Sequence, residues 1–332
     1  MNLAGPLRAF LATSFLLTAT LSLADDPGTA GLSNTAVVPA DTKLAVRIHL
    51  PRIAKSVTGG RLLKGIEAVV QAESGVDQPL RPQMTEILGM DPFDEVRAID
   101  ISTSQLASSD GEMPNGLAVV HLGRTAGNLE GLLTMLPQYR FQSYGKQTIH
   151  QAEFEGQPVF ATVLTGSSGQ KNFVASNQSS SVQSFVGGND LAGQTVNVEY
   201  SDQPGLLIQS KLLSIPQQWS DQPGPMAGLQ LVKDAKLQIK EVASDLAINV
   251  SLRADDPDRA EQLRQMVQGL KAMMPIALEK ARGEGEGAEL EETFELVQRT
   301  RVTRDGPTVV LELSVPIETV LQFFRDEAKL PL

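Results

Sequence analysis

The residues best suited to metal chemistry in this 332-residue chain are its three histidines, His49, His121 and His150. Each is predicted at or near the end of a strand in the first half of the chain, which would permit a three-histidine metal site. None of them has HxH, HxxxH or HExxH spacing, so no two ligands are paired locally. We therefore interpret the histidines as packing or surface residues, and we predict no metal site.

A nucleophile is suggested at one place, where Ser168 and Lys171 have the Ser-x-x-Lys spacing of penicillin-recognising enzymes. That chemistry requires the serine at a helix N-terminus, so that the lysine returns one turn later. Here the tetrad lies in a Gly/Ser turn that is predicted between two strands, and no Lys-Thr-Gly follows. The sequence also has no Gly-x-Ser-x-Gly elbow and no phosphate-binding loop. We predict no catalytic residue and no cofactor.

Two acidic clusters are further candidates. Asp255, Asp256 and Asp258 lack the glycine of a calcium loop, and capping of the following helix explains them. The run from Glu284 to Glu292 is interpreted as a solvated charge run, with weak calcium association as the alternative. Hydrolysis by paired carboxylates leaves little trace in a sequence, so a hydrolase of unknown type stays a third possibility.

Four residues are candidates for ligand binding. Met266, Met273 and Met274 lie on or beside the apolar stripe of the longest predicted helix, where methionines can form an adaptable hydrophobic groove. Trp219, in a Pro-flanked segment, is a candidate exposed anchor. Core packing of the methionines, and of Trp219 at the junction of two modules, is the competing interpretation, and the residue pattern favours it.

Composition excludes several classes of protein. The net charge is -11, which argues against a nucleic-acid binder and disfavours anionic lipid partners. The chain has no cysteine, so disulfide scaffolds, cysteine-based zinc sites and thiol catalysis are excluded. A hydrophobic share of 41% with 20% charged residues is typical of a globular protein.

The N-terminus indicates export. Residues 1–24 have a basic Arg8, an uncharged apolar run and a small-residue cleavage site at Ala24, as in a secretory signal peptide. The apolar run is shorter than a bilayer span requires, and an uncleaved anchor helix is the alternative. Residues 25–40 are predicted to be a flexible lead-in. We expect a periplasmic or extracellular protein with no transmembrane segment after cleavage.

Strands and helices are predicted from hydrophobic periodicity and from turn residues. Strands are expected at 44–50, 96–101, 117–122, 146–151, 158–164, 173–175, 206–212, 235–242, 246–252, 294–302 and 308–315. Helices are expected from Pro51 (weakened at Gly59 and Gly60), at 129–136 and 179–186, from Pro257, and from Pro316.

The order of these elements predicts an α+β fold with two similar modules, residues 41–200 and 201–332. Each module would have a mixed or antiparallel sheet with helices packed on one face. We interpret the similarity as an internal duplication in which the strand at Leu117 corresponds to the strand at Leu246, and the turn at Gly156 to the turn at Gly306. A competing registration pairs the strand at Leu44 with the strand at Leu246.

The layout resembles uncharacterised bacterial secreted proteins of a domain-of-unknown-function type. The likeness rests on Val38-Pro39-Ala40-Asp41 leading into Leu44-Ala45-Val46, and on Leu88-Gly89-Met90-Asp91-Pro92 before Val96. A strand–helix–hairpin follows, and the likeness spans roughly residues 38–188. It implies export and a repeated α+β build, and it supplies no catalytic or ligand-binding residues.

These features together predict an exported, non-catalytic envelope protein that acts by binding an unknown protein or an envelope surface. The first alternative is a periplasmic carrier or sensor of an apolar small molecule, held between a sheet face and the helix that carries Met266. Filled cores with an exposed apolar patch favour the binding protein, whereas an uncovered apolar sheet face favours the carrier.

Overall fold

The computed structural model describes residues 32–74, 85, 89–91, 95–106, 115–123, 129–154, 156–166, 169–187, 195–215, 225–284 and 294–327. The chain divides into two compact units. Unit 1 contains residues 1–207 and 318–332, and unit 2 contains residues 208–317. The predicted signal segment and Trp219 lie outside the described residues.

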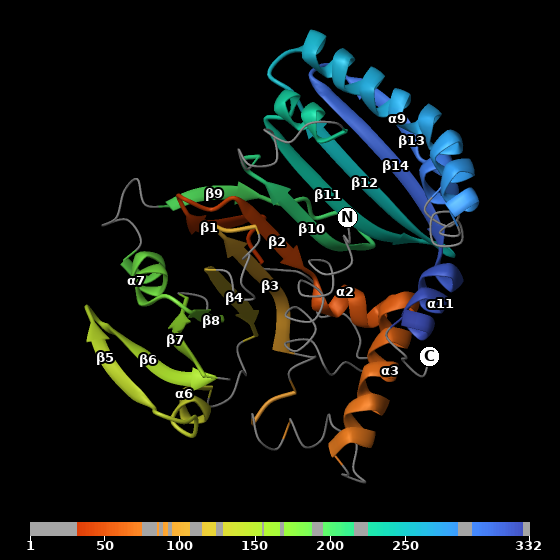
Figure 1. Cartoon of the computed structure of the whole chain (residues 1–332). Coiled ribbons are helices and arrows are strands. Elements are labelled where there is room, and N and C mark those ends of the chain that lie inside the picture. The colour runs from red at the N-terminus through yellow and green to blue at the C-terminus, as the bar shows by residue number, and fades with distance from the viewer. Residues whose placement is uncertain are drawn as a thin grey trace. The chain divides into compact units, whose positions relative to one another are not determined.

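The strands of the unit 1 sheet pair antiparallel in the order β2-β3-β4-β8-β7-β6-β5. Its strands are β2 (Leu44–Ile48), β3 (Val96–Thr103), β4 (Gly116–Leu122), β5 (Arg140–Tyr144), β6 (Gln147–Phe154), β7 (Gln157–Thr165) and β8 (Lys171–Ser176). β10 (Leu206–Leu212) follows beside β2, and the unit boundary falls within it. Figure 1 labels these strands and colours them by their position in the chain.

Helices bury both faces of this sheet around β3 and β4. On one face, α2 (Leu50–Lys55) and α3 (Val57–Ser74) pack Leu50 and Leu63 against Ile99 and Leu122. On the other face, α7 (Ser179–Gly187) inserts the fully buried Val182 among Leu117, Val119, Ile149 and Val174. The short α6 (Leu129–Leu133) and α11 (Ile317–Glu327) complete the described helices of the unit.

A separate two-stranded ribbon joins the start of the described chain to a distant segment. β1 (Thr35–Pro39) pairs antiparallel with β9 (Thr195–Glu199), so that Ala36 lies opposite Val198 and both are buried. The ribbon falls partly within the stretch expected to be a flexible lead-in. Thr-Ala-Val-Val has high β-propensity, and its alternate residues find an apolar partner only through this long-range pairing.

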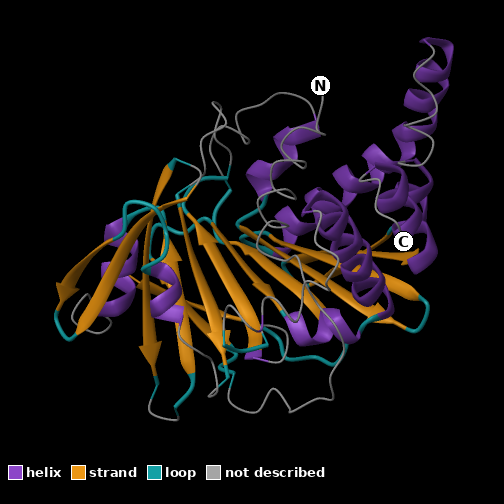
Figure 2. Cartoon of the chain, turned by 90° about the horizontal axis from the view of Figure 1, so that it is seen from below, coloured by secondary structure: helices purple, strands orange, loops and turns teal. Residues whose placement is uncertain are grey.

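Unit 2 has the strand order β13-β14-β12-β11-β10, where β11 is Asp234–Val242, β12 is Asp245–Arg253, β13 is Arg301–Asp305 and β14 is Thr308–Pro316. α9 (Pro257–Glu284) and the 3₁₀ segment η2 (Pro225–Leu231) cover one face, where Leu263 packs with Leu252 and Val309. Asp256 caps α9 by accepting from the Arg259 amide at 2.8 Å. Figure 2 shows the strands and helices of both units.

The α+β class is confirmed, while several local predictions differ from the structure. The strands β1, β5 and β9 were not expected. The helix from Pro51 breaks at Ser56, whose backbone is extended and whose hydroxyl accepts from the Gly59 amide at 2.9 Å, so the break lies before the glycines. No helix in the described part of the chain is long and apolar enough to cross a membrane.

The predicted strand 294–302 is wrong for most of its length, because residues 294–299 are helical and β13 begins only at Arg301. Glu295, Leu296, Gln298 and Arg299 of this segment favour helix over strand. The Lys271 ammonium donates at 2.7 Å to the carbonyls of Gln298 and Thr300 and so satisfies acceptors at the end of this helix.

Two glycines provide a stability test. A Cβ atom at Gly59 would lie 2.1 Å from the Ile53 carbonyl oxygen, whereas a Cβ atom at Gly269 in α9 would contact nothing within 4 Å. We expect Gly59→Ala to lower the free energy of unfolding by about 1–3 kcal/mol, because backbone must move. Gly269→Ala should raise it by about 0.5–1 kcal/mol through helix propensity. Urea unfolding measures both, and equal effects would contradict the close approach of α2 and α3.

Candidate functional site

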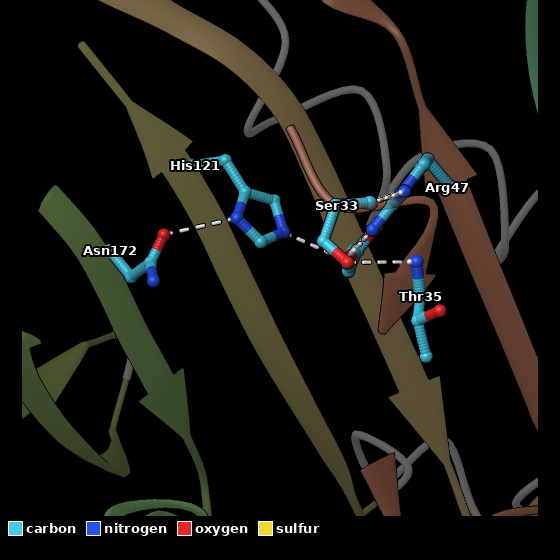
Figure 3. Close-up of polar contacts among 6 residues, drawn as sticks. Ser33, Thr35, Arg47, His121 and Asn172 are labelled. Atoms are coloured by element: carbon cyan, nitrogen blue, oxygen red, sulfur yellow. Dashed lines mark hydrogen bonds and ion pairs between the residues drawn. The ribbon is translucent and has the colours of Figure 1, made fainter. Parts of the chain in front are cut away.

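Four polar side chains form a continuous row across neighbouring strands of unit 1. Arg47 on β2 lies opposite Asp100 on β3, and His121 on β4 lies opposite Asn172 on β8. Asp100 is directly opposite Val119, two residues from His121, so the row steps diagonally between β3 and β4. Figure 3 shows His121 between Asn172 and the Arg47 side of the row.

Arg47 and Asp100 form a buried, bidentate ion pair. The Arg47 Nε atom donates to Asp100 Oδ1 at 2.6 Å, and Nη2 donates to Oδ2 at 2.7 Å. The two side chains are only 1% and 6% exposed. Parallel hydrogen bonds of this kind combine charge with fixed geometry, which offsets the cost of removing both ions from water.

His121 is held at both ring nitrogens. Its Nε2 atom is 2.7 Å from Asp100 Oδ2, and its Nδ1 atom is 3.0 Å from Asn172 Oδ1. Its side chain is 21% exposed, which makes it the most accessible member of the Arg47–Asp100–His121 set. With both nitrogens engaged, the imidazole has no nitrogen left to take a proton from a nucleophile.

The segment around the β1–β9 ribbon covers the Arg47 end of the row. Arg47 Nη1 donates to the Ser33 carbonyl at 2.6 Å, and the Ser33 hydroxyl accepts from the Thr35 amide at 3.1 Å. The Arg47 guanidinium carbon also lies 4.5 Å from the centre of the Tyr200 ring, a cation–π contact. The Tyr200 amide donates to the Asn34 carbonyl at 2.7 Å, so the ribbon and the arginine stabilise one another.

Burial and the neighbouring groups shift the pKa of Asp100 in opposite directions, whereas burial and the Asp100 charge shift the pKa of Tyr200 in the same direction. Burial raises the pKa of Asp100, but hydrogen bonds from Arg47 and His121 outweigh it, so the pKa lies below the usual 3.8. The pair therefore stabilises the fold above that value, and the stabilisation is lost as pH falls through the lower folded pKa. Burial and the Asp100 charge raise the pKa of Tyr200, so its hydroxyl stays protonated.

The polar row is suited to positioning strands. Asp100 is saturated by Arg47 and His121, and the charged end of the row is closed by Ser33 and Tyr200. His121 is the member of the row that solvent reaches, and its two ring nitrogens contact Asp100 and Asn172. The row connects β2, β3, β4 and β8 to the ribbon.

The remaining histidines lie in different surroundings. His49 is buried at the N-terminal end of α2, and His150 on β6 is buried with its Nδ1 atom 2.9 Å from the Tyr139 hydroxyl. Within the described ranges, no three His, Asp or Glu side chains are grouped so that they could hold a metal ion.

The structure distributes the predicted ligand-binding methionines along α9. Met266 packs against η2, since a Cβ atom at Gly228 would lie 2.5 Å from the Met266 methyl carbon. Met274 is half-buried, and Met273 is 60% exposed. The helix thus turns Met266 toward η2 and leaves Met273 in solvent.

An exposed strip on α9 forms a second candidate site. Leu270, Met273 and Ile276 are 42%, 60% and 62% exposed and recur every third residue, and we call them the α9 strip. Neighbours three apart on a helix lie on adjoining parts of its surface. Leu270 is exposed, whereas Leu263 and Val267 of the same helix pack in the core of unit 2.

Sequence reasoning missed the Arg47–Asp100 pair and Tyr200. A signal was present, because Arg47 and Asp100 carry opposite charges within two predicted strands, 44–50 and 96–101. Two opposite charges in two such strands indicate cross-strand pairing. Tyr200 had no comparable signal, because its partner is set by the ribbon.

The sequence matches no family model and no curated protein. Among solved structures, the chain is similar to two crystal forms of TP0453. Form III gives a TM-score of 0.40 at 6% identity, and form I gives 0.37 at 8% identity. Each comparison covers 88% of this chain and 98% of the other. Scores below 0.5 carry no conclusion on fold or function.

Asp100→Asn tests the buried pair. It leaves the Arg47 charge buried without a counter-ion, and we expect unfolding free energy to fall by about 3–5 kcal/mol. The matched control is Asp234→Asn, which removes the carboxylate from the more exposed pair with Arg253 and should cost less than about 1 kcal/mol. Chemical denaturation at pH 7 compares the two, and similar losses would contradict the importance of the buried pair.

His49 gives a pH dependence of stability. Burial, with the positive charges of Arg52 and Arg47, lowers the pKa of His49 from 6.5 to about 4. Between these values the unfolded chain binds a proton that the folded chain does not, so stability falls as pH falls. The loss is on the order of 3 kcal/mol across that window. In His49→Gln, the unfolding free energy should depend less steeply on pH between pH 6.5 and 4. An unchanged pH dependence would mean that groups other than His49 cause it.

Proposed function

We propose that the chain is an exported, non-catalytic envelope protein that binds another protein or an envelope surface through the α9 strip. The observation that carries the proposal is the exposure of Leu270, Met273 and Ile276 on a helix whose opposite side is anchored in a filled core. Burying large apolar side chains that stand in water is favourable, and such groups mark interaction sites.

The filled core supports binding over the carrier alternative. Leu263, Val267 and Val309 pack beneath α9, and Met266 occupies the space next to Gly228. An apolar cargo held between this helix and the sheet would have to displace these contacts. The contacts of His121 likewise give no support to a hydrolase, because both of its ring nitrogens are engaged.

Export is the part of the proposal that rests on the sequence alone. The apolar run before Ala24, with a basic residue ahead of it, supports cleavage and a periplasmic or extracellular location. The absence of cysteine is compatible with an oxidising compartment, where the fold is held by packing alone.

We also propose that the two units arose by duplication. The strand order β2-β3-β4-β8-β7 of unit 1 has the same form as the order β10-β11-β12-β14-β13 of unit 2. The two orders support the registration of β4 with β12, which contain Leu117 and Leu246. They favour pairing the turn at Gly306 with the β7–β8 turn instead of the turn at Gly156, with β5 and β6 as an addition to unit 1.

Site-specific photocrosslinking in cells that make the protein tests the binding surface. We expect a photoreactive residue at position 276 to give a discrete crosslinked species, because an apolar partner surface would lie against it. A photoreactive residue at position 262, also exposed on α9, is the matched control and should give none.

The double change Leu270→Ser and Met273→Ser should abolish the crosslink at position 276 while altering the unfolding free energy by less than about 0.5 kcal/mol per site, since both side chains are exposed. Equal crosslinking at positions 262 and 276 would reject the α9 strip. Native mass spectrometry of the same material tests export through loss of residues 1–24, and a reproducible small adduct would instead support the carrier.

A further inference from the structure

The sheet of unit 2 has a polar face opposite α9. Alternate residues of β11, β12 and β14 are apolar and lie toward the core, as shown by Ala235, Leu252 and Leu311. The intervening residues form the other face, where Lys236 lies opposite Ser251 and Gln238 lies opposite Asn249. These side chains are half-buried, so they are available to a ligand at the sheet surface.

Positive charge is concentrated on this face in a chain whose net charge is -11. Lys236 and Lys240 lie on the same side of β11 as Gln238, two residues before it and two residues after it. Lys211 of β10 is close enough to Lys236 to act on it electrostatically. Among the residues that the structure describes, no carboxylate forms an ion pair with Lys211, Lys236 or Lys240.

Two features show that the face is electrostatically unbalanced. Burial, followed by the positive charge of Lys211, lowers the pKa of Lys236. The Gln238 side-chain amide nitrogen is buried and has no hydrogen-bond partner within the described ranges. A bound anion would relieve the repulsion between the two lysines, and rotation of the half-buried Gln238 side chain would let its amide donate to that anion.

We propose that this face of unit 2 is a binding site for a phosphate-class oxyanion, with Lys211, Lys236 and Lys240 supplying positive charge and Gln238 an amide donor. Lysine ammonium groups bind phosphate as compact charges with three donors each, and Asn249 adds a neighbouring polar group. The site is independent of the α9 strip, which lies on the helix that covers the opposite face.

Acidic neighbours limit the size of the anion. Glu312 shares this face opposite Asn249 and also lies opposite Arg301, while Asp234 is paired with Arg253 at the end of β11. Extended polyanions would meet these carboxylates and the acidic surface. A single phosphate group, free or on a headgroup, is small enough to contact Lys236, Gln238 and Lys240 on β11 without reaching Glu312, which lies two strands away on β14.

Isothermal titration with inorganic phosphate at low salt tests the site on the full mature chain. We expect saturable binding that Lys236→Gln weakens about tenfold, the loss expected when one charged hydrogen bond is removed. Lys43→Gln removes the same charge from an exposed position in unit 1 and should change the affinity less than about twofold. Thermal unfolding of each variant checks that it is folded.

A second readout separates binding from general charge effects. Nuclear magnetic resonance of the lysine side chains should show the pKa of Lys236 rising when phosphate is added, because a nearby anion favours the charged amine. No saturable phosphate binding, or an equal loss in Lys43→Gln, would overturn the site.

The source of the phosphate group is resolved by two further probes. Binding of glycerol 3-phosphate without binding of phosphatidylglycerol vesicles assigns a small phosphate ester. Vesicle binding that Lys236→Gln removes assigns a lipid headgroup. Either outcome supports the site, whereas vesicle binding that Lys43→Gln weakens equally would contradict it.

Discussion

The buried pair of Arg47 and Asp100 is the interaction on which the arrangement of unit 1 depends. Removing two ions from water costs free energy unless the carboxylate oxygens and the guanidinium N–H groups find hydrogen-bond partners in the protein. The surrounding structure meets that demand: His121 completes Asp100, the Ser33 carbonyl accepts from Arg47, and the Tyr200 ring lies against the guanidinium. A segment at the beginning of the described chain and another near residue 200 are thereby fixed by one side chain. The pair joins the adjacent strands β2 and β3 through two parallel hydrogen bonds.

The two units use their sheet faces differently. In unit 1, helices bury both faces of the sheet around β3 and β4. The polar side chains of the Arg47–Asp100–His121 row on these strands bond to one another. In unit 2 one face is packed beneath α9, and the other presents lysines and amides. Within the row, Arg47, Asp100 and His121 satisfy one another, whereas the buried His150 Nε2 atom and the Tyr200 hydroxyl have no hydrogen-bond partner among the described residues. The proposed contacts fall on unit 2, where the three residues of the α9 strip are exposed in succession along one helix and the lysines lie on the sheet face opposite α9.

The sequence was most informative where structure is local. Alternation of apolar residues predicted the strands at Leu117 and Leu246, and Asp256-Pro257 predicted the start of α9, because caps and periodicity act within a few residues. The ribbon of Thr35 and Glu199 was missed because each strand is short and gains stability only from the other. The helix at 294–299 was taken for a strand because a short apolar run fits either structure. For the candidate site, Met273 was identified as a residue of interest, but its exposure depends on how α9 rotates over the sheet.

The ribbon also bears on the order of events during folding. Thr35 pairs with Glu199, so the first described strand gains its partner only after most of unit 1 has been synthesised. Contacts between distant segments form late and slow the search for the native state. Pairing of β1 with β9 therefore closes a loop that contains β2 to β8, and the entropy cost of that closure is offset by the contacts of Ser33 and Tyr200 with Arg47.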